Sequence, residues 1–445
     1  MNRWLIANAR LVNEGRVIET DIRIRHGRIE RIESGLTTGA GETMINARGR
    51  YIMPGMIDAQ VHFREPGLTR KGNIASESRA AVAGGITSYM DMPNTYPPTT
   101  TRQALAIKFS RAAGRSTANY SFYMGASNDN LDEIRAIAAD EACALKVFMG
   151  ASTGNMLVDK PDILAGIFEH SPLMVVTHCE DNPTIERNMA AAVARYGKDI
   201  PARAHSEIRS NEACLKSSTL AVGLAKEHAT RLHVLHLTTA EEMSLFEPGP
   251  VAEKQITGEV CIHHLYFIDE DYDELGNLIK CNPSIKTAAD RKALRQALRD
   301  DRIDLIATDH APHLLSEKTG SYETAAAGLP LVQYAVPAAW SLVASRVLTP
   351  ERLVEKMAHN PAIRFQLAER GFVREGYWAD LIMLDDTKRT IVDNQSMLSQ
   401  CGWTPFAGRK LPATVAATWV NGHLVWRDGL LTGVVPGQKL EFSRD

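Results

Sequence analysis

The middle of the chain alternates between short apolar runs and longer amphipathic stretches. Runs such as Asn119–Met124 and Leu145–Phe148 are rich in aromatic, β-branched and other apolar residues, which is typical of buried strands. The stretches between most of them repeat their apolar positions at helical spacing. The pattern predicts strands at Tyr51–Ile57, Thr87–Met92, Asn119–Met124, Leu145–Phe148, Leu173–Thr177, Leu232–Leu237, Thr257–Ile262 and Ile303–Ala307. It predicts helices among them at Ile74–Ala83, Arg102–Ala113, Leu131–Ala139 and Arg291–Arg299.

Eight strand–helix units of this total length are typical of a single (β/α)₈ barrel. The structural alternative is a doubly wound open sheet. The chain contains no Gly-x-Gly-x-x-Gly segment and no phosphate-binding loop that would support an open nucleotide-binding sheet. We therefore expect a barrel, in which the side chains at the carboxyl ends of the strands converge on one pocket.

Both ends of the chain have the alternating pattern of exposed strands. Asp21–Arg25 alternates polar and apolar residues, His26-Gly27 can turn the chain, and Arg28–Ile32 repeats the alternation. Near the other end, Asn421-Gly422 between two apolar stretches is a strong signal for a type I′ hairpin. The pattern permits the two end segments to pair into one small sheet domain.

Composition and charge narrow the class of protein. The chain has 445 residues, of which 44% are hydrophobic and 23% charged, enough for one large domain and a smaller one. The net charge is −3 with acids and bases mixed, so we expect neither a nucleic-acid nor a membrane partner. No apolar run approaches the ~18–20 residues that span a bilayer, and the first residues lack the apolar core of a signal peptide. The six cysteines are scattered without a Cys-x-x-Cys pair, which predicts reduced thiols in a cytoplasmic protein.

Polar side chains follow or lie within most of the predicted barrel strands. A lone histidine beside an apolar run is more often a core residue than a ligand, but six polar groups at the same end of successive strands predict one site. Imidazole and carboxylate groups at an open site suit zinc, which can lower the pKa of a bound water to about 7. A lysine inside a buried strand is costly unless it is neutral or paired, although it can also extend to the surface. The six candidates are His62, Asn94, Lys146, His178, His236 and Asp309.

Two segments resemble the motifs of the dihydroorotases, a branch of the amidohydrolase superfamily. Residues 58–67 read Asp-Ala-Gln-Val-His-Phe-Arg-Glu-Pro-Gly, and residues 309–313 read Asp-His-Ala-Pro-His. The usual first motif of the family is Asp-x-His-x-His-Phe-Arg-Glu-Pro-Gly, so Gln60 stands where the first histidine belongs. Asn360-Pro361-Ala362 and the segment Gly376–Leu381 are also similar to the superfamily, and the resemblance covers nearly the whole chain.

The resemblance implies a (β/α)₈ barrel with a small composite β-sandwich. It places residues 1–52 and 365–445 in the sandwich and residues 53–364 in the barrel. It also implies a homodimer.

The resemblance further implies a set of metal ligands. His62 and Asp309 would bind one metal ion, with Gln60 as a weaker candidate ligand, and His178 and His236 would bind a second. Lys146 would bridge the two as a carbamate formed with carbon dioxide. We expect one tightly bound zinc ion or two, and Asp309 as the catalytic group. The substrate-binding residues implied by the family are Arg64, Asn94, Asn282 and His313.

The activity implied is the reversible cyclisation of N-carbamoyl-aspartate to dihydroorotate in pyrimidine synthesis. Arginine recognises carboxylates with paired hydrogen bonds, and a ring carboxylate distinguishes dihydroorotate from hydantoins and allantoin. A hydantoinase or allantoinase is the nearest alternative, against which Arg64 and His313 argue. A catalytically inactive homologue that serves as a structural partner is another alternative, which Gln60 keeps open.

Other polar residues have structural interpretations. Asn94 and Asn282 each adjoin a proline and could only shape a turn. The additional histidines, His205, His263 and His264, are expected to be structural or supporting. The segment Gly320–Pro330, rich in glycine and alanine, is expected to form a loop over the substrate.

Overall fold

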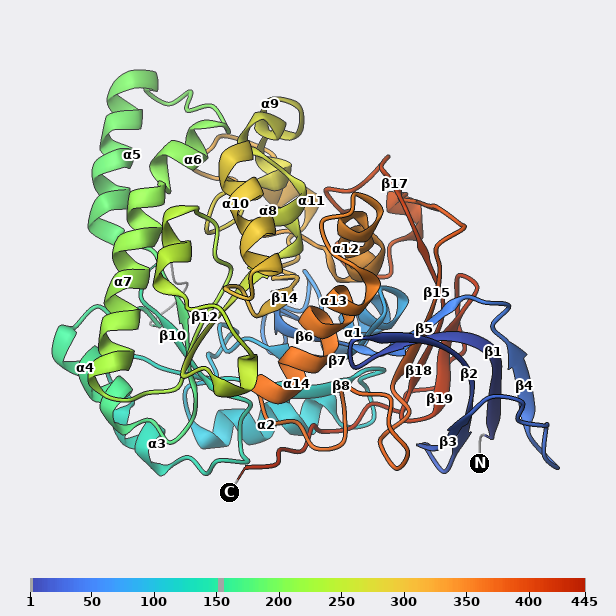
Figure 1. The fold of residues 1–445 in the computed structure, drawn as a ribbon. Coiled ribbons are helices and arrows are strands. Elements are labelled where there is room, and N and C mark those ends of the chain that lie inside the picture. The colour runs from blue at the N-terminus through green and yellow to red at the C-terminus, as the bar shows by residue number, and fades with distance from the viewer. Residues whose placement is uncertain (1–2, 151–155, 445) are drawn as a thin grey trace.

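The computed structural model describes residues 3–150 and 156–444. Figure 1 shows a barrel wrapped by helices and, beside it, a sheet domain made from both ends of the chain. The barrel has eight parallel strands, with the third interrupted at Tyr123. They are β6 (Met56–Val61), β7 (Ile86–Asp91), β8 (Asn119–Phe122) continued by β9 (Met124–Gly125), β10 (Leu145–Phe148), β11 (Val175–His178), β12 (Leu232–Val234), β13 (Ile256–Cys261) and β14 (Leu305–Ala307).

The ring closes between the first and last strands. Val61 forms a parallel bridge with His310, and the His62 amide donates to the His310 carbonyl at 2.7 Å. Closure brings the carboxyl end of β6 next to that of β14. The predicted (β/α)₈ barrel is therefore confirmed.

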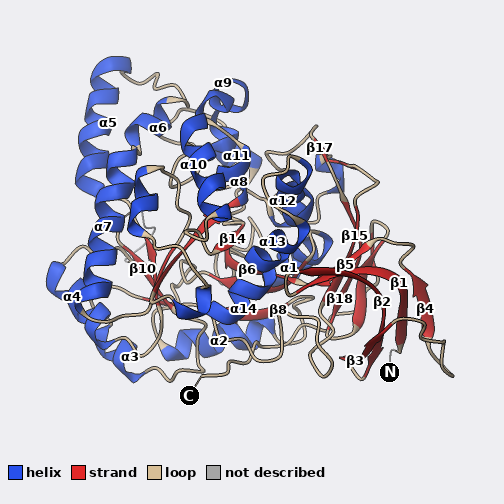
Figure 2. Cartoon of the chain, viewed as in Figure 1, coloured by secondary structure: helices blue, strands red, loops and turns tan. Residues whose placement is uncertain are grey.

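Helices cover the outside of the barrel (Figure 2). In α10, Leu294 and Leu298 are buried while Arg299 is exposed, and Thr287 begins the helix with a capping box to Asp290. The longer helices are α1 (Ile74–Ala83), α2 (Arg102–Ala112), α3 (Leu131–Ala136), α4 (Pro161–His170), α5 (Asn182–Tyr196), α7 (Asn211–Glu227), α10 (Ala288–Arg299) and α12 (Ala335–Ala344). Shorter ones are α6 (Ala204–Ile208), α8 (Ile262–Tyr266), α9 (Tyr272–Leu275), α11 (Leu315–Lys318), α13 (Pro350–Val354) and α14 (Asn360–Arg364).

The prediction of a single strand over Tyr51–Ile57 was wrong. The run divides at Gly55 into β5 (Tyr51–Pro54), which belongs to the sheet domain, and β6, which begins the barrel. A Cβ at Gly55 would lie 2.1 Å from Oγ1 of Thr87, so the chain passes between the two sheets where only glycine fits. Both halves are buried, and apolarity alone does not mark the change of sheet.

The sheet domain combines strands from both chain ends, as the resemblance implied. Its order is β20-β19-β18-β15-β5-β1-β2-β3, with β4 on β1, and its core includes Ile6, Ile22, Leu381 and Trp419. The strands are β1 (Trp4–Asn13), β2 (Arg16–Arg25), β3 (Arg28–Glu33), β4 (Thr43–Asn46), β15 (Leu381–Asp385), β18 (Thr414–Val420), β19 (His423–Arg427) and β20 (Leu430–Leu431); β16 (Thr390–Ile391) and β17 (Lys410–Leu411) form a separate pair.

The predicted hairpin between β18 and β19 is confirmed. Asn421 and Gly422 have φ angles of 49° and 72°, as a type I′ turn requires.

A buried polar cluster joins the sheet domain to the barrel. Asp380 pairs with Arg370 and accepts hydrogen bonds from the Asn119 side chain at 3.0 Å and the Asn421 amide at 2.7 Å. Asn119 begins β8 of the barrel, whereas Asp380 and Asn421 flank strands of the sheet domain. The division into residues 1–52 with 365–445 and residues 53–364 stays a prediction.

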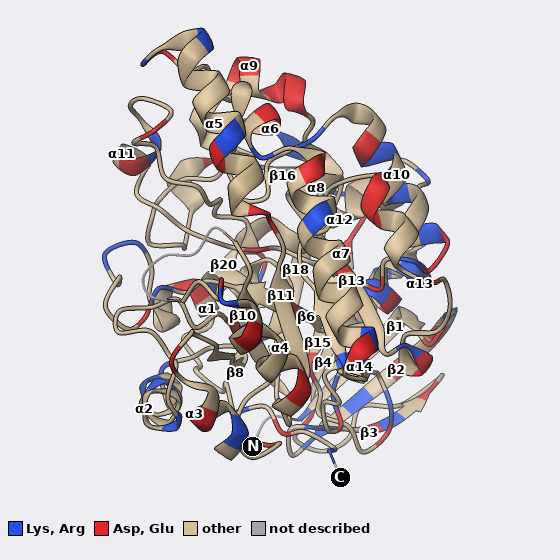
Figure 3. Ribbon diagram, turned by 90° about the vertical axis from the view of Figure 1, so that its left-hand side faces the viewer, with Lys and Arg blue, Asp and Glu red and all other residues tan. Residues whose placement is uncertain are grey.

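Charge is distributed as the composition indicated. Basic and acidic positions occur on the same helices in the face drawn in Figure 3, as on α10. None of the helices in the described parts of the chain has the length and apolarity needed to cross a membrane.

Candidate active site

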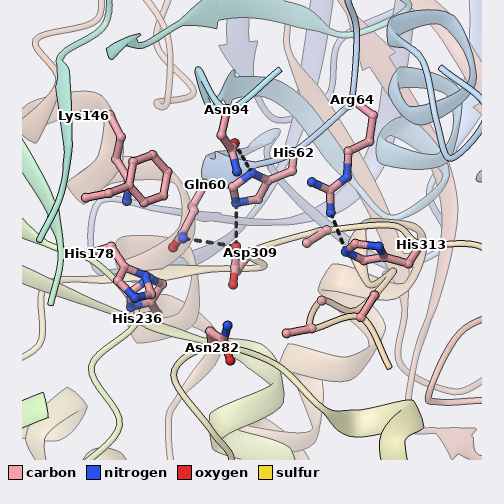
Figure 4. A pocket seen from close by; sticks show the side chains of 15 residues that line it. Gln60, His62, Arg64, Asn94, Lys146, His178, His236, Asn282, Asp309 and His313 are labelled. Carbon is pink, nitrogen blue, oxygen red and sulfur yellow. Dashed lines mark hydrogen bonds and ion pairs between the residues drawn. The ribbon is translucent and has the colours of Figure 1, made fainter. Parts of the chain in front are cut away.

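One pocket lies where the barrel strands end, with a cavity of about 320 Å³. Figure 4 shows His178 and His236 together on one side, Gln60, His62 and Asp309 in the centre, and Arg64 beside His313 on the other side. The segment Gly320–Pro330 contributes Ala326, Ala327 and Gly328 to the lining. All ten residues predicted for the site line it: Gln60, His62, Arg64, Asn94, Lys146, His178, His236, Asn282, Asp309 and His313.

In the centre of the pocket, a ring nitrogen faces a carboxylate oxygen. Nδ1 of His62 lies 2.8 Å from Oδ1 of Asn94 and donates to it, so Nε2 of a neutral ring is an acceptor. That nitrogen lies 3.0 Å from Oδ1 of Asp309, which also accepts from Nε2 of Gln60 at 3.1 Å. Burial acts to raise the pKa of Asp309, but its hydrogen bond to His62 and nearby positive charge lower it below the usual value. A ring nitrogen this close to a carboxylate either carries a proton that it donates or shares a cation with the oxygen, so the pair is suited to a metal ion.

A second pair of ring nitrogens lies beside the first. Nε2 of His178 donates to Oε2 of Glu180 at 2.8 Å, which leaves Nδ1 as an acceptor. Nδ1 lies 2.9 Å from Nε2 of His236. A carboxylate that binds the outer nitrogen of a histidine is the usual support for a metal-binding imidazole.

Glu180 and its partner Arg209 were missed by the sequence analysis. Burial acts to raise the pKa of Glu180, but the charge of Arg209 and the bond to His178 hold it at about 2. The carboxylate is therefore ionised and fixes the tautomer of His178. In the sequence, Glu180 follows His178 by two residues, which hints at a contact, but this spacing alone does not reveal one.

Lys146 lies within β10 and is buried beside the pocket. Burial lowers the pKa of Lys146 to about 7, against the opposing charge of Asp309 and Glu259. Its Nζ lies 4.5 Å from the centre of the Phe148 ring, and it forms no ion pair with any residue that the structure describes. A substantial fraction of the side chain is thus a neutral amine near neutral pH.

On the opposite side of the pocket, cationic groups surround His313. Nη2 of Arg64 lies 3.1 Å from Nε2 of His313, and Nζ of Lys71 lies 3.0 Å from Nδ1. Lys71 also pairs with Glu317 at 3.2 Å. Burial, Arg64 and Lys71 together lower the pKa of His313, so its ring is neutral. Lys71 was missed because it lies in a loop, with no strand end to indicate it.

The contact between Arg64 and His313 has one possible direction. A guanidinium has no acceptor atom, so Nε2 of the neutral His313 ring accepts from Nη2 of Arg64. Arg64 has no carboxylate partner within the described ranges; its Nε donates to the Pro312 carbonyl at 3.1 Å.

Asn282 faces the pocket, whereas Glu65 lies outside it. The buried Oδ1 of Asn282 has no hydrogen-bond partner among the described residues, and Asn282 lines the pocket. Glu65 does not line it: its carboxylate accepts from Arg115 at 2.7 Å and from the Ile74 amide at 3.1 Å. Glu65 therefore anchors the loop that carries Arg64.

The chain is similar to known proteins over its whole length. The model of the Amidohydrolase family matches residues 51–425. Dihydroorotase of Halobacterium salinarum is 34% identical, over 96% of this chain and 97% of that protein, and dihydroorotase of Methanosarcina mazei is 30% identical, over 95% and 94%. Among solved structures, L-hydantoinase from Arthrobacter aurescens superposes with a TM-score of 0.92 at 27% identity, covering 99% of this chain and 100% of that one. The chain belongs to the amidohydrolase family.

Proposed function

We propose that this protein is a dihydroorotase, which interconverts N-carbamoyl-aspartate and dihydroorotate in de novo pyrimidine (UMP) biosynthesis. The observation that carries the proposal is the Arg64 guanidinium, which lines the pocket without a carboxylate partner among the described residues. Dihydroorotate has a ring carboxylate that can accept from it, whereas hydantoins and dihydropyrimidines have none. The relatives named dihydroorotase, which cover nearly the whole chain, support the same reading.

Two donor sets in the pocket fit divalent ions. The acceptors of His178 and His236 suit zinc, and those of His62 and Asp309 suit a second ion. The amine of Lys146, made partly neutral by burial, can add carbon dioxide and become an anionic carbamate between the two sets. Zinc held there would supply a water of lowered pKa and polarise the ring carbonyl.

The residues of the chain then perform the proton transfers. In the ring-opening direction, water adds to the ring amide carbonyl and Asp309 accepts its proton. Asp309 passes that proton to the ring nitrogen as the carbon–nitrogen bond breaks. Gln60 donates to Asp309 and holds the carboxylate in position.

At the other end of the substrate, three residues bind its polar groups. Arg64 donates to the ring carboxylate, and His313 holds the guanidinium in position. Asn94 and Asn282 contribute amide groups, of which Oδ1 of Asn282 is a free acceptor for a ring N–H.

We also infer a homodimer in the cytoplasm. All six cysteines lie within the described residues and are free thiols, as expected of a reducing compartment. The substrate is a small molecule, with no nucleic-acid or membrane partner.

The function is tested by replacing Arg64 with leucine. Arg64→Leu removes the carboxylate donor and leaves the candidate metal ligands in place. We expect kcat/KM on dihydroorotate to fall by about 10²-fold, because one charge-assisted bond contributes about 1.5–3 kcal/mol. On dihydrouracil, which lacks the carboxylate, any turnover should change much less. Equal losses on both substrates would contradict recognition of the carboxylate by Arg64.

A further inference from the structure

A second group of metal-binding side chains lies outside the pocket, at the carboxyl end of β13. Cys261 ends that strand, and His263 and His264 lie in the short helix α8 that follows it. All three are buried, and one potential ligand atom from each lies within 4.8 Å of the others. None of the three lines the pocket.

Hydrogen bonding leaves all three donor atoms available. Nε2 of His264 donates to the Pro283 carbonyl at 3.1 Å, so its Nδ1 is an acceptor, and this atom has no partner in the described part of the structure. The His263 ring is close enough to the Thr308 backbone to donate to it, and its other nitrogen has no partner there. Sγ of Cys261 has one distant contact, 3.7 Å to Oε1 of Gln60. Buried polar atoms without partners usually cost about 1–3 kcal/mol each, so a cluster of them indicates a missing ligand.

Gln60 connects this group to the pocket. Its amide nitrogen donates to Asp309, so its oxygen is directed toward Cys261. Gln60 also lines the pocket, so the group lies directly behind the pocket wall. Adjacent ligands of a tetrahedral zinc ion lie about 3.5 Å apart, given bond lengths of about 2.0–2.3 Å. The 3.7 Å between sulfur and oxygen is close to that spacing.

We propose that Cys261, His263 and His264 bind a divalent ion of the zinc class, with the Gln60 oxygen as the nearest fourth ligand. One sulfur and two imidazole nitrogens form a donor set typical of zinc. The bond from His264 to the Pro283 carbonyl is the outer support that orients a metal-binding imidazole. The site is separate from the two proposed donor sets of the pocket and does not depend on the proposed substrate.

Cobalt provides a direct test, because a thiolate bound to Co²⁺ gives a charge-transfer absorption in the near ultraviolet. Metal-stripped full-length protein is titrated with Co²⁺. We expect this absorption to saturate at one ion per chain and to be absent in Cys261→Ser. His263→Gln and His264→Gln should weaken the Co²⁺ affinity of this site by at least ~10-fold, the effect typical of losing an outer partner alone. Nitrogen and oxygen ligands in the pocket give no such absorption.

Two cysteine variants serve as controls. Cys143→Ser alters another fully buried thiol on the chain and should keep the absorption. Cys281→Ser should keep it as well, although that sulfur lies 4.0 Å from Nε2 of His264. Circular dichroism checks that each variant folds. If Cys261→Ser does not fold, the weaker Co²⁺ affinity expected of His263→Gln tests the site.

Three results would overturn the proposal: no thiolate absorption in the cobalt-loaded wild type, its persistence in Cys261→Ser, or its loss in Cys281→Ser instead. Activity on dihydroorotate is measured separately. An inactive protein that keeps the absorption would count against the proposed function and leave this metal site standing.

Discussion

At the scale of single residues, the pocket depends on which nitrogen of each histidine is already bonded. Asn94 occupies Nδ1 of His62, and Glu180 occupies Nε2 of His178. Each ring is therefore left with one acceptor directed at Asp309 or His236, respectively. The neighbours of a histidine thus decide whether it can bind a metal ion, because a neutral imidazole offers only one lone pair.

The role of Asp309 is tested by its amide. Asp309→Asn keeps an oxygen that can accept from Gln60 but removes the basic carboxylate. We expect kcat to fall by at least ~10²-fold, the low end for a general acid–base group. Turnover and metal content are measured on the same folded preparation. Near-normal turnover in a variant that retains its metal would remove Asp309 from proton transfer.

The identity of residue 60 should set the metal content of the pocket. Gln60 presents its amide nitrogen to Asp309, where an imidazole would present a metal ligand, so the site with His62 and Asp309 should hold its ion weakly. Ions are counted in a Cys261→Ser background, so that only the pocket contributes. After mild chelation we expect about one ion per chain with Gln60, and Gln60→His should raise the content toward two.

Two outcomes would contradict this view of Gln60. Two ions retained with Gln60 in that background would show that the amide does not weaken the site. No ion and no activity on dihydroorotate would favour the inactive homologue instead.

At the scale of elements, the loop after β6 positions Arg64. Gly67 in this loop has a φ of 84°, and a Cβ there would lie 1.9 Å from the Tyr96 carbonyl oxygen. The Tyr96 amide in turn donates to the Pro66 carbonyl at 3.2 Å. Close backbone packing therefore sets where the guanidinium points, which is the physical reason for glycine at this place in the motif.

Gly67→Ala should consequently impair substrate binding. The added methyl group must push the loop away from Tyr96, and a displacement of about 1 Å can cost up to ~10²-fold. We expect kcat/KM on dihydroorotate to fall by about 10–100-fold while metal content is retained. Gly114→Ala is the matched control, since Gly114 has a φ of 69° and no atom within 4 Å of the added Cβ. Similar kcat/KM values for the two variants would contradict a role for the Tyr96 contact in positioning Arg64.

At the scale of the whole molecule, one buried ion pair helps to join the two parts. Arg370 and Asp380 are each about 4% exposed, and Asp380 also accepts from Asn119 of the barrel. Removing one partner of a buried pair leaves a charge without compensation, at a typical cost of about 3–5 kcal/mol.

Asp380→Ala should therefore lower the free energy of unfolding by about 3 kcal/mol or more, as measured by urea titration. Glu369→Ala, which breaks the exposed pair with Arg28, should cost less than about 1 kcal/mol. Equal effects of the two changes would show that the buried pair does not stabilise the junction.

The sequence by itself determined the barrel, the hairpin at Asn421-Gly422 and six of the residues that line the pocket, while the family resemblance supplied four more. Strand periodicity and burial are local properties of the chain, and the carboxyl ends of parallel strands converge whatever the exact register. A polar residue at the end of an apolar run, such as His178 or Asp309, could therefore be assigned to the pocket without knowing its neighbours.

Only the tertiary structure decided which atoms meet. The run Tyr51–Ile57 is apolar throughout, so its division between two sheets at Gly55 could not be read from its pattern. Lys71 contacts His313 across 242 positions, and Cys261 contacts Gln60 across 201. Such pairings depend on how the barrel closes and where its loops pack, because sequence pattern encodes period and burial but not the partner of a given atom.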